Sequence, residues 1–177
     1  NQIKKTKICL LLIKKIGKMS NIFIALGSNL ENPKEQVESG ILSIKEIDGV
    51  KILSESSLYE TPPVGVLNQP NFVNAVIKIT SNHNPYELLN ELLKIENKAG
   101  RIRVEKNGPR ILDLDILLFD NLILNDKNLT LPHPRMHERL FVLMPLKDID
   151  ENIVIPNQGS IKHIINKLTS ENINRIK

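Results

Sequence analysis

The sequence predicts one α+β domain, a ferredoxin-like two-layer sandwich in which helices pack on an antiparallel sheet, followed by a C-terminal addition. Three observations predict this class. Strand-like and helix-like stretches follow one another in the order strand, helix, strand, strand, helix, strand. A chain of 177 residues is long enough to bury a substantial core. Its residues are 41% hydrophobic but only 3% aromatic, so Ile, Leu and Val must build that core.

The first strand and helix have clear boundaries. Residues 22–26 form a short apolar run that is typical of a buried strand. A helix should follow, because Asn32-Pro33 joins a capping residue to one that suits the first turn, and Glu35 can complete a capping box. Residues 50–60 predict the next strand. Residues 61–65 contain two prolines and a glycine, which predicts a rigid loop.

The strand expected at residues 72–80 has the clearest alternation. Its two faces would carry Val73, Ala75, Ile77 and Ile79 inward and Phe72, Asn74, Val76 and Lys78 outward. A second helix should open at Asn84-Pro85 with Glu87 completing a capping box, and Gly100 should end it.

The rest of the pattern is less regular. It predicts a polar loop at residues 101–110, a strand at 111–119, a small hairpin near 121–129, a short helix from the Pro-His-Pro segment at 132–134 to about residue 140, and an amphipathic helix at 160–168.

Charge is unevenly distributed along the chain. Residues 1–20 hold six lysines and no acidic residue, whereas the remainder carries 18 basic and 20 acidic side chains, a formal charge of −2. A mildly acidic body argues against nucleic acid as a partner. The apolar run at residues 8–13 is too short to span a membrane. The single cysteine, Cys9, excludes an internal disulfide and fits a cytoplasmic location.

The same asymmetry sets the expected domain boundary. Met19 stands directly before the first strand, so we expect residues 1–18 to be an upstream or non-native extension and residues 19–177 to form the single domain. A basic amphipathic extension is the alternative interpretation of residues 1–18.

The sharpest chemical signal lies in residues 108–117. Asp113 and Asp115 are two apart on a predicted strand, so both project from the same face. Their Cα atoms would be about 6–7 Å apart, a spacing that can hold a pair of magnesium ions. An Asp-x-Asp pair alone can equally be a solvated strand face.

Arginines surround this acidic pair in the sequence. Arg101, Arg103 and Arg110 precede it, and His133 and Arg139 follow. Arginines give bidentate contacts to phosphate oxygens, so the set suggests a phosphate chain bridged to metal. For each arginine alone, a solvated loop charge is the simpler interpretation. His133 could be a turn histidine, and Glu96 an ordinary surface acid of its helix.

A second candidate site lies on the strand at residues 72–80. Phe72 and Asn74 share its outward face, where an aromatic ring and an amide suit a flat, nitrogen-rich heterocycle. A Phe packed beneath a loop is the alternative. Residues 27–30 lack the glycine spacing and the lysine of a phosphate loop, so they predict only a tight turn from strand to helix.

These segments, in this order, resemble the 6-hydroxymethyl-7,8-dihydropterin pyrophosphokinases. The resemblance covers the chain from about residue 21 to about residue 168, and its matching stretches are 24–30, 59–65, 69–75, 100–103, 108–117 and 131–134. The Gly-Pro-Arg-x-x-Asp-x-Asp-Ile-Leu run is its most specific part. Three positions depart from the family pattern: Asn107 stands where Trp is frequent, Phe72 where Tyr is common, and Pro134 where some members have Tyr.

The resemblance implies an enzyme of folate synthesis that transfers a diphosphate from ATP to the pterin hydroxymethyl group, releases AMP, and uses two magnesium ions. It implies a cytoplasmic monomer whose partners are ATP and the pterin, with no nucleic acid or membrane. It also implies residue roles. Magnesium would be bound by Asp113 and Asp115, which act with Arg101 and Arg110 in catalysis. ATP would contact Glu96, Arg103, Arg110, Ile116, His133 and Arg139. The pterin pocket would comprise Thr61, Pro63, Val64, Gly65, Phe72, Asn74 and Phe141, with the two Phe rings enclosing the pterin.

The sequence supports one further expectation and allows two alternative functions. Residues 101–107 are polar and lie between possible glycine hinges, so we expect them to close over the bound substrates. An RNA-binding module shares the predicted topology, but the exposed aromatic signature of such modules is absent. A different metal-dependent nucleotidyl transferase could use the same acidic pair.

A chain that begins at Met19 should fold and turn over like the full chain, because the lysine-rich segment lies outside the strand and helix pattern. Thermal unfolding and turnover of the two proteins, compared side by side, test this. A fall in melting temperature for the shorter chain would mean that residues 1–18 contribute an integral element.

Overall fold

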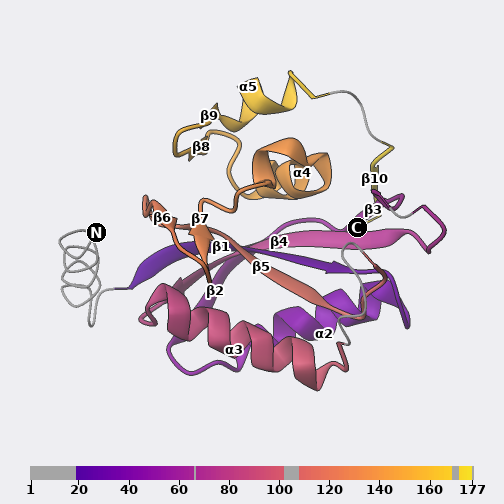
Figure 1. The fold of residues 1–177 in the computed structure, drawn as a ribbon, viewed down its shortest axis with the longest axis horizontal. Coiled ribbons are helices and arrows are strands. Elements are labelled where there is room, and N and C mark those ends of the chain that lie inside the picture. Colours follow the sequence, from indigo (N-terminus) through magenta and orange to yellow (C-terminus); the bar gives the residue numbers. More distant parts are fainter. Residues whose placement is uncertain (1–18, 66, 102–107, 169–171, 177) are drawn as a thin grey trace.

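The computed structural model describes residues 19–65, 67–101, 108–168 and 172–176. An antiparallel sheet with helices on both faces forms its centre (Figure 1). In chain order the main elements are β1 (Ser20–Ser28), α2 (Pro33–Lys45), β2 (Val50–Glu55), β3 (Tyr59–Thr61), β4 (Phe72–Ser81), α3 (Pro85–Lys98), β5 (Asp113–Phe119) and α4 (Leu140–Ile149). The smaller elements are β6 (Leu124–Asn125), β7 (Thr130–Leu131), the 3₁₀ turn η1 (Met136–Glu138), β8 (Val154–Ile155), β9 (Gly159–Ser160), α5 (Ile161–Ile165) and β10 (Asn174–Arg175).

The strand order of the sheet is β10-β3-β4-β1-β5, with β2 paired to another part of β4. β1 is the central strand, and β4 and β5 both run antiparallel to it. Its apolar residues Ile22, Ile24 and Leu26 face one side and are almost completely buried. They form the main core together with α2, α3 and the inward side chains of β4 and β5.

The sheet is covered on both faces, so the two-layer prediction is incomplete. α2 and α3 lie on one face, and α4 with α5 above it lies on the other (Figure 1). A second apolar cluster joins Phe23 and Val76 of the sheet to Val142, Leu143 and Leu146 of α4. Val76, which the strand pattern assigns to the outer face, is therefore fully buried.

α4 differs most from the sequence-based expectation, since it begins at Leu140, where the predicted short helix should end. Pro145 lies inside α4, and the helix is apolar almost all round. A helix of that kind is stable only when other elements enclose it. The polar outer stripe that identifies α2 and α3 in the sequence is therefore missing here.

Both predicted capping boxes can be checked against the structure. At α3 the box is present: the Asn84 side chain accepts hydrogen bonds from the main chain of Tyr86 and Glu87, and Glu87 accepts one from Asn84 N–H. At α2 the prediction is wrong, because Asn32 makes no side-chain cap. Glu31 and Asn32 both have positive φ in the tight turn after β1, so Asn32 enters the helix with a left-handed backbone.

Several strand boundaries also differ. β1 continues to Ser28, so Gly27 is a strand residue and the turn follows it. The strand predicted at residues 50–60 is two strands, β2 and β3. Between them the Ser56 side chain interrupts the main-chain hydrogen bonds to β4, because its Oγ accepts the Val76 N–H at 2.9 Å. The hairpin expected near residues 121–129 is the β6–β7 pair. The final helix, capped by Ser160, ends at Ile165 rather than near residue 168.

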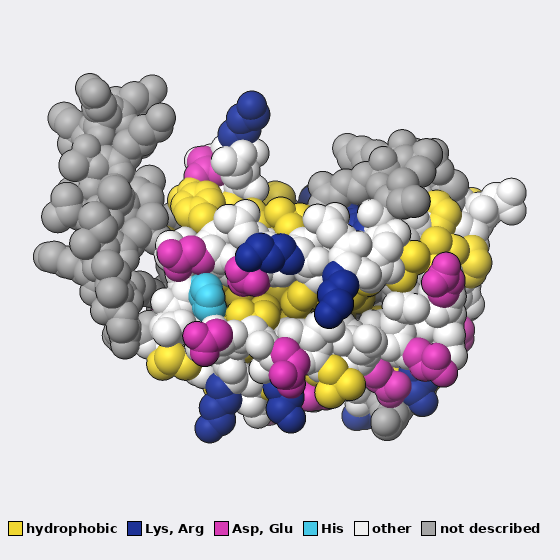
Figure 2. All heavy atoms as spheres, turned by 90° about the horizontal axis from the view of Figure 1, so that it is seen from below, with side chains coloured by type: hydrophobic (Ala, Val, Ile, Leu, Met, Phe, Trp, Pro, Cys, Tyr) yellow, Lys and Arg dark blue, Asp and Glu magenta, His cyan; other side chains and the backbone are white. Residues whose placement is uncertain are grey.

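The outer face of α2 and α3 carries basic and acidic side chains interspersed with one another (Figure 2). Among the described residues, no helix is both long enough and apolar enough to cross a membrane.

Replacing Leu143 by Ala should lower the free energy of unfolding by about 2–5 kcal/mol, because the side chain is fully buried between α4 and the sheet. Chemical denaturation measures this loss. The exposed Leu42 of α2 is the matched control, and its replacement by Ala should change stability by less than about 0.5 kcal/mol. An equally small effect at Leu143 would show that α4 is not part of the cooperative core.

Candidate active site

A cleft opens on the α4 side of the sheet, where β1, β4 and β5 meet α4 and the end of β3. It brings together residues that are far apart in the sequence. Predicted site residues in its lining are Thr61, Val64, Gly65, Phe72, Asn74, Arg110, Asp113, Asp115, Arg139 and Phe141.

Small residues of β1 form the floor of the cleft. Gly27 pairs with Asn74 of β4 on one side and with Asp113 of β5 on the other, and Ala25 pairs with Asp115. A Cβ atom at Gly27 would stand 3.1 Å from the Asn74 amide oxygen, closer than side chains normally approach. A side chain at this position would therefore require the Asn74 amide to shift by a few tenths of an ångström. Neither Ala25 nor Gly27 is among the predicted site residues, although their alternation with Ile24 and Leu26 is a signal that could have identified them.

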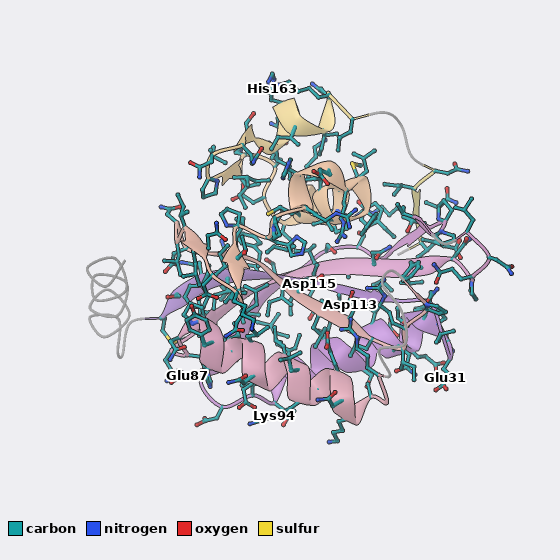
Figure 3. The ribbon with its side chains drawn as sticks, in the orientation of Figure 1. Glu31, Glu87, Lys94, Asp113, Asp115 and His163 are labelled. Carbon is teal, nitrogen blue, oxygen red and sulfur yellow. The ribbon has the colours of Figure 1, made fainter. Side chains whose placement is uncertain are left out.

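The two carboxylates of β5 project into this cleft (Figure 3). Asp113 is held by two arginines: Arg101 contacts one of its carboxylate oxygens and Arg110 the other. The side chain of Asp115 is 41% exposed to solvent. Although part of its surface is accessible, the surrounding cleft walls desolvate the Asp115 carboxylate and raise its pKa to about 6, and the neighbouring Asp113 carboxylate adds to the shift. Negative charge at Asp115 is thus only partly compensated by the protein.

Glu96 of α3 anchors this cluster from below. Its side chain is almost completely buried, accepts a hydrogen bond from Leu114 N–H at 2.7 Å, and forms an ion pair with Arg101. A buried carboxylate with these two partners is satisfied. Glu96 therefore fixes the Arg101 guanidinium in front of Asp113.

His133 approaches Asp115 from the segment before η1, with 4.0 Å between its Nε2 and the nearer carboxylate oxygen. Its main-chain N–H donates to Leu117 O at 2.9 Å, which fixes the segment to β5. Burial lowers the pKa of His133 to about 4, and the positive charge of Arg139 adds to the shift. The imidazole is therefore neutral near pH 7 and can donate or accept one hydrogen bond.

Two aromatic rings lie at the other end of the cleft, and each is contacted by an arginine. The guanidinium carbon of Arg110 lies 5.5 Å from the centre of the Phe72 ring, and that of Arg139 lies 5.6 Å from the centre of the Phe141 ring. Such distances are typical of cation–π contacts. The aromatic and the charged parts of the cleft are thus directly adjacent.

Asn74 is held in a defined orientation between the rings and the floor. Its Nδ2 donates to Thr61 Oγ1 at 2.9 Å, and both side chains are buried. The Asn74 amide can therefore present a fixed hydrogen-bonding edge to a ligand.

The remaining predicted residues lie outside the lining. Arg101 contacts Asp113 and His133 lies near Asp115, whereas Glu96 contacts Arg101 and the main chain of Leu114. The Ile116 side chain is buried in the main core, and Pro63 also lies outside the lining. Of the segment expected to close over the site, residues 101–107, all but Arg101 lie outside the described residues, Arg103 and Asn107 included. The sequence also gave no signal for Arg135 and Glu138 of the η1 region, which line the cleft.

Known proteins share this sequence pattern. A family model described as 7,8-dihydro-6-hydroxymethylpterin-pyrophosphokinase (HPPK) matches residues 23–151. A 2-amino-4-hydroxy-6-hydroxymethyldihydropteridine pyrophosphokinase from Haemophilus influenzae is 43% identical over 147 residues, which cover 83% of this chain and 92% of that protein. A protein of the same name from Bacillus subtilis is 43% identical over 136 residues, covering 76% of this chain and 81% of the relative.

The fold is shared as well. The crystal structure of Plasmodium falciparum HPPK-DHPS with pterin and p-hydroxybenzoate resembles this chain with a TM-score of 0.69 at 17% identity. The match covers 89% of this chain but only 44% of that longer protein. Because the family model matches residues 23–151 and both relatives are 43% identical over more than three quarters of either chain, this chain belongs to the 7,8-dihydro-6-hydroxymethylpterin-pyrophosphokinase family.

Proposed function

We propose that this cleft is where the chain performs the pyrophosphokinase reaction, an ATP-dependent step of folate synthesis. The diphosphate of ATP passes to the hydroxymethyl group of 6-hydroxymethyl-7,8-dihydropterin, and AMP is released. One observation carries this assignment to the cleft: an acidic pair, flanking arginines and an aromatic pair lie in one continuous lining. These are the groups that a metal-bound triphosphate and a flat heterocycle require.

The donor set suits magnesium. Asp113 and Asp115 offer oxygen ligands from one strand face. Burial, followed by the neighbouring Asp113 carboxylate, raises the pKa of Asp115, and a bound cation would favour the charged form of both carboxylates. Among the described residues, no group of three or more acidic, His or Cys side chains could hold a metal alone. Magnesium commonly combines one or two carboxylates with substrate phosphates. We therefore propose two magnesium ions that bind together with ATP and supply charge neutralisation of the triphosphate.

The arginines are proposed to exchange partners when ATP binds. Arg101 and Arg110 both contact Asp113 in the ligand-free protein. A metal held by the Asp113 carboxylate would neutralise that partner and so would leave both guanidinium groups able to contact phosphate oxygens. Arg139 and the neutral His133 would contact the phosphates from the opposite wall, and Arg103 completes the proposed set. These charges stabilise the negative charge that develops on AMP as it leaves.

The adenine base is proposed to lie along the free edge of β5. Leu114 N–H points away from β1, toward Glu96. Ile116 lies two residues further along the same strand, so its main-chain N–H and C=O point to the same edge. Since the Ile116 side chain is buried, its proposed contact with ATP comes from the main chain. Glu96 acts by holding Leu114 and Arg101 in place.

The pterin is proposed to occupy the slot between Phe72 and Phe141, with its amide edge against Asn74 and Thr61. The loop after β3 supplies the remaining wall, from Pro63, Val64 and Gly65. The arginine over each ring supports this placement, because these arginines are also proposed to bind the phosphates, so the slot lies directly beside the proposed phosphate site.

In the proposed reaction the pterin hydroxyl oxygen bonds to the β-phosphorus. The bond from that phosphorus to the oxygen bridging to the α-phosphorus breaks, AMP leaves with this oxygen, and the hydroxyl proton passes to solvent.

Several finer assignments accompany this function. The strand order and the two crossover helices support a ferredoxin-like arrangement, with the chain after β5 as a C-terminal addition. We also propose that residues 19–177 form one domain, which acts as a monomer in the cytoplasm.

Incubation with ATP, magnesium and 6-hydroxymethyl-7,8-dihydropterin should yield AMP and a diphosphorylated pterin, because the transferred unit is the terminal diphosphate. Chromatographic separation of the nucleotides measures this, and a reaction without pterin is the control. Stoichiometric ADP would indicate transfer of a single phosphate, and free pyrophosphate would indicate a nucleotidyl transferase. Either result would contradict the assignment.

Replacing Asp113 or Asp115 by Ala should each lower kcat about a thousandfold while the protein stays folded. Metal charge stabilisation contributes several kcal/mol to lowering the barrier, at about 1.4 kcal/mol per factor of ten. Steady-state turnover at saturating magnesium and circular dichroism measure the two effects. Glu91→Ala is the control, since Glu91 is a surface carboxylate of α3 that pairs with Lys94. Near-normal turnover in either aspartate variant would remove the metal assignment.

A further inference from the structure

The short strand β3 supports much of the proposed pterin slot. It has only three residues, Tyr59–Thr61, yet its register sets Tyr59 opposite Asn74 and Thr61 opposite Phe72. Thr61 is its last residue and also orients the Asn74 amide. A displacement of β3 would therefore disturb Asn74 and Phe72, which are proposed to contact the pterin.

A ladder to β4 alone would leave such a short strand at the edge of the sheet, where pairing is weakest. The C-terminal strand β10 covers this edge. Asn174 pairs with Glu60 and Arg175 with Tyr59, and Ile176 N–H donates to Leu58 O at 2.9 Å. β3 is thus held on both sides, by β4 and by a segment more than 110 residues later in the chain.

Side chains extend this connection to α4. Arg175 Nε donates to Ser57 Oγ at 2.7 Å, and an Arg175 terminal nitrogen lies 3.9 Å from Asp148 Oδ2. The same carboxylate oxygen accepts Ser57 N–H at 3.2 Å. Tyr59 also hydrogen-bonds to Asp148; burial raises the pKa of Tyr59 to about 12, and that hydrogen bond adds to the shift.

Asp148 is placed where it can connect the two walls of the slot. It lies near the end of α4, the helix that begins at Leu140 and carries Phe141 in its first turn. On the opposite wall, Ser57 lies just before β3 and Tyr59 is the first residue of β3, the strand that pairs with Phe72 and Asn74 of β4. The Arg175–Asp148 contact is exposed on the arginine side, and such an ion pair alone contributes little stability. Its effect must therefore be on geometry, through the group of hydrogen bonds that share Asp148.

We propose that Arg175 is a positioning residue for the pterin: together with β10 it fixes β3 against α4 and so sets the spacing between the Phe72 and Phe141 walls. This proposal rests on the pterin slot proposed above. Neither Arg175 nor Asp148 lines the cleft, and neither contacts the β5 and η1 residues of the ATP side in the contacts described above.

Arg175→Ala and Asn174→Pro test the proposal on the full chain. The first removes the contacts to Ser57 and Asp148, and the second removes the main-chain donor opposite Glu60. Each should raise the KM for the pterin about three- to tenfold, the change that corresponds to losing one or two hydrogen bonds. The kcat and the KM for ATP should stay within about twofold of the unmodified protein. Arg175→Lys, which keeps the charge but loses the Nε donor, should give an intermediate pterin KM.

Lys162→Ala is the matched control, because Lys162 also forms an exposed ion pair in the C-terminal part, with Glu151 at 3.3 Å. It should leave all three kinetic constants unchanged. Hydrogen exchange at residues 57–61 gives a readout that does not depend on activity, and it should be faster in Arg175→Ala and Asn174→Pro than in the control.

The outcomes separate this proposal from the proposed function. If the unmodified chain forms no AMP in a pterin-dependent manner, the function itself is wrong, whatever the exchange data show. If the unmodified chain is active, an unchanged pterin KM in both variants overturns the positioning role. Equal losses in pterin KM, ATP KM and kcat would overturn it too, since they would indicate general destabilisation of the fold.

Discussion

Strand β1 carries large side chains on one face and small ones on the other, and both the core and the cleft depend on this difference. Ile22, Ile24 and Leu26 fill the core beneath the sheet, whereas Ala25 and Gly27 leave space above it. Because β1 is central, its neighbours β4 and β5 bring their own residues to the edges of that space. A larger side chain at Gly27 would meet the Asn74 amide. The cleft is therefore a consequence of side-chain size on a single strand.

Charge in the cleft is arranged before any ligand arrives. Asp113 is held between Arg101 and Arg110, and Arg101 is held in turn by the buried Glu96. This mutual neutralisation makes it possible to keep several charged groups close together in a partly buried site. Among the described residues Asp115 has no such close arginine pair, and burial together with the neighbouring Asp113 carboxylate raises its pKa to about 6. The ligand-free protein thus pairs the arginines that are proposed to bind phosphate with the carboxylate that is proposed to bind metal.

The third layer contributes to the site as well as to stability. α4 buries Leu143 and Leu146 against the sheet and presents Phe141 and Arg139 to the cleft. Near its other end, Asp148 contacts the segment that enters β3 and the C-terminal strand. Packing of α4 and placement of the aromatic wall are therefore coupled. Ser57 and Arg175, which are far apart in the sequence, meet at this one helix.

Local sequence determined the regular elements and the chemistry of the site. Alternation on β4 and β5, the capping box at Asn84, and the Asp113–Asp115 pair were all evident, because each depends on residues a few positions apart. Only tertiary structure decided the rest. α4 has no polar stripe and is helical because other elements enclose it. The Asn32 side chain does not cap α2, because the turn after β1 fixes its backbone in a left-handed conformation. Gly27 at the cleft floor and β10 beside β3 depend on strand pairing between residues far apart, which no local pattern records.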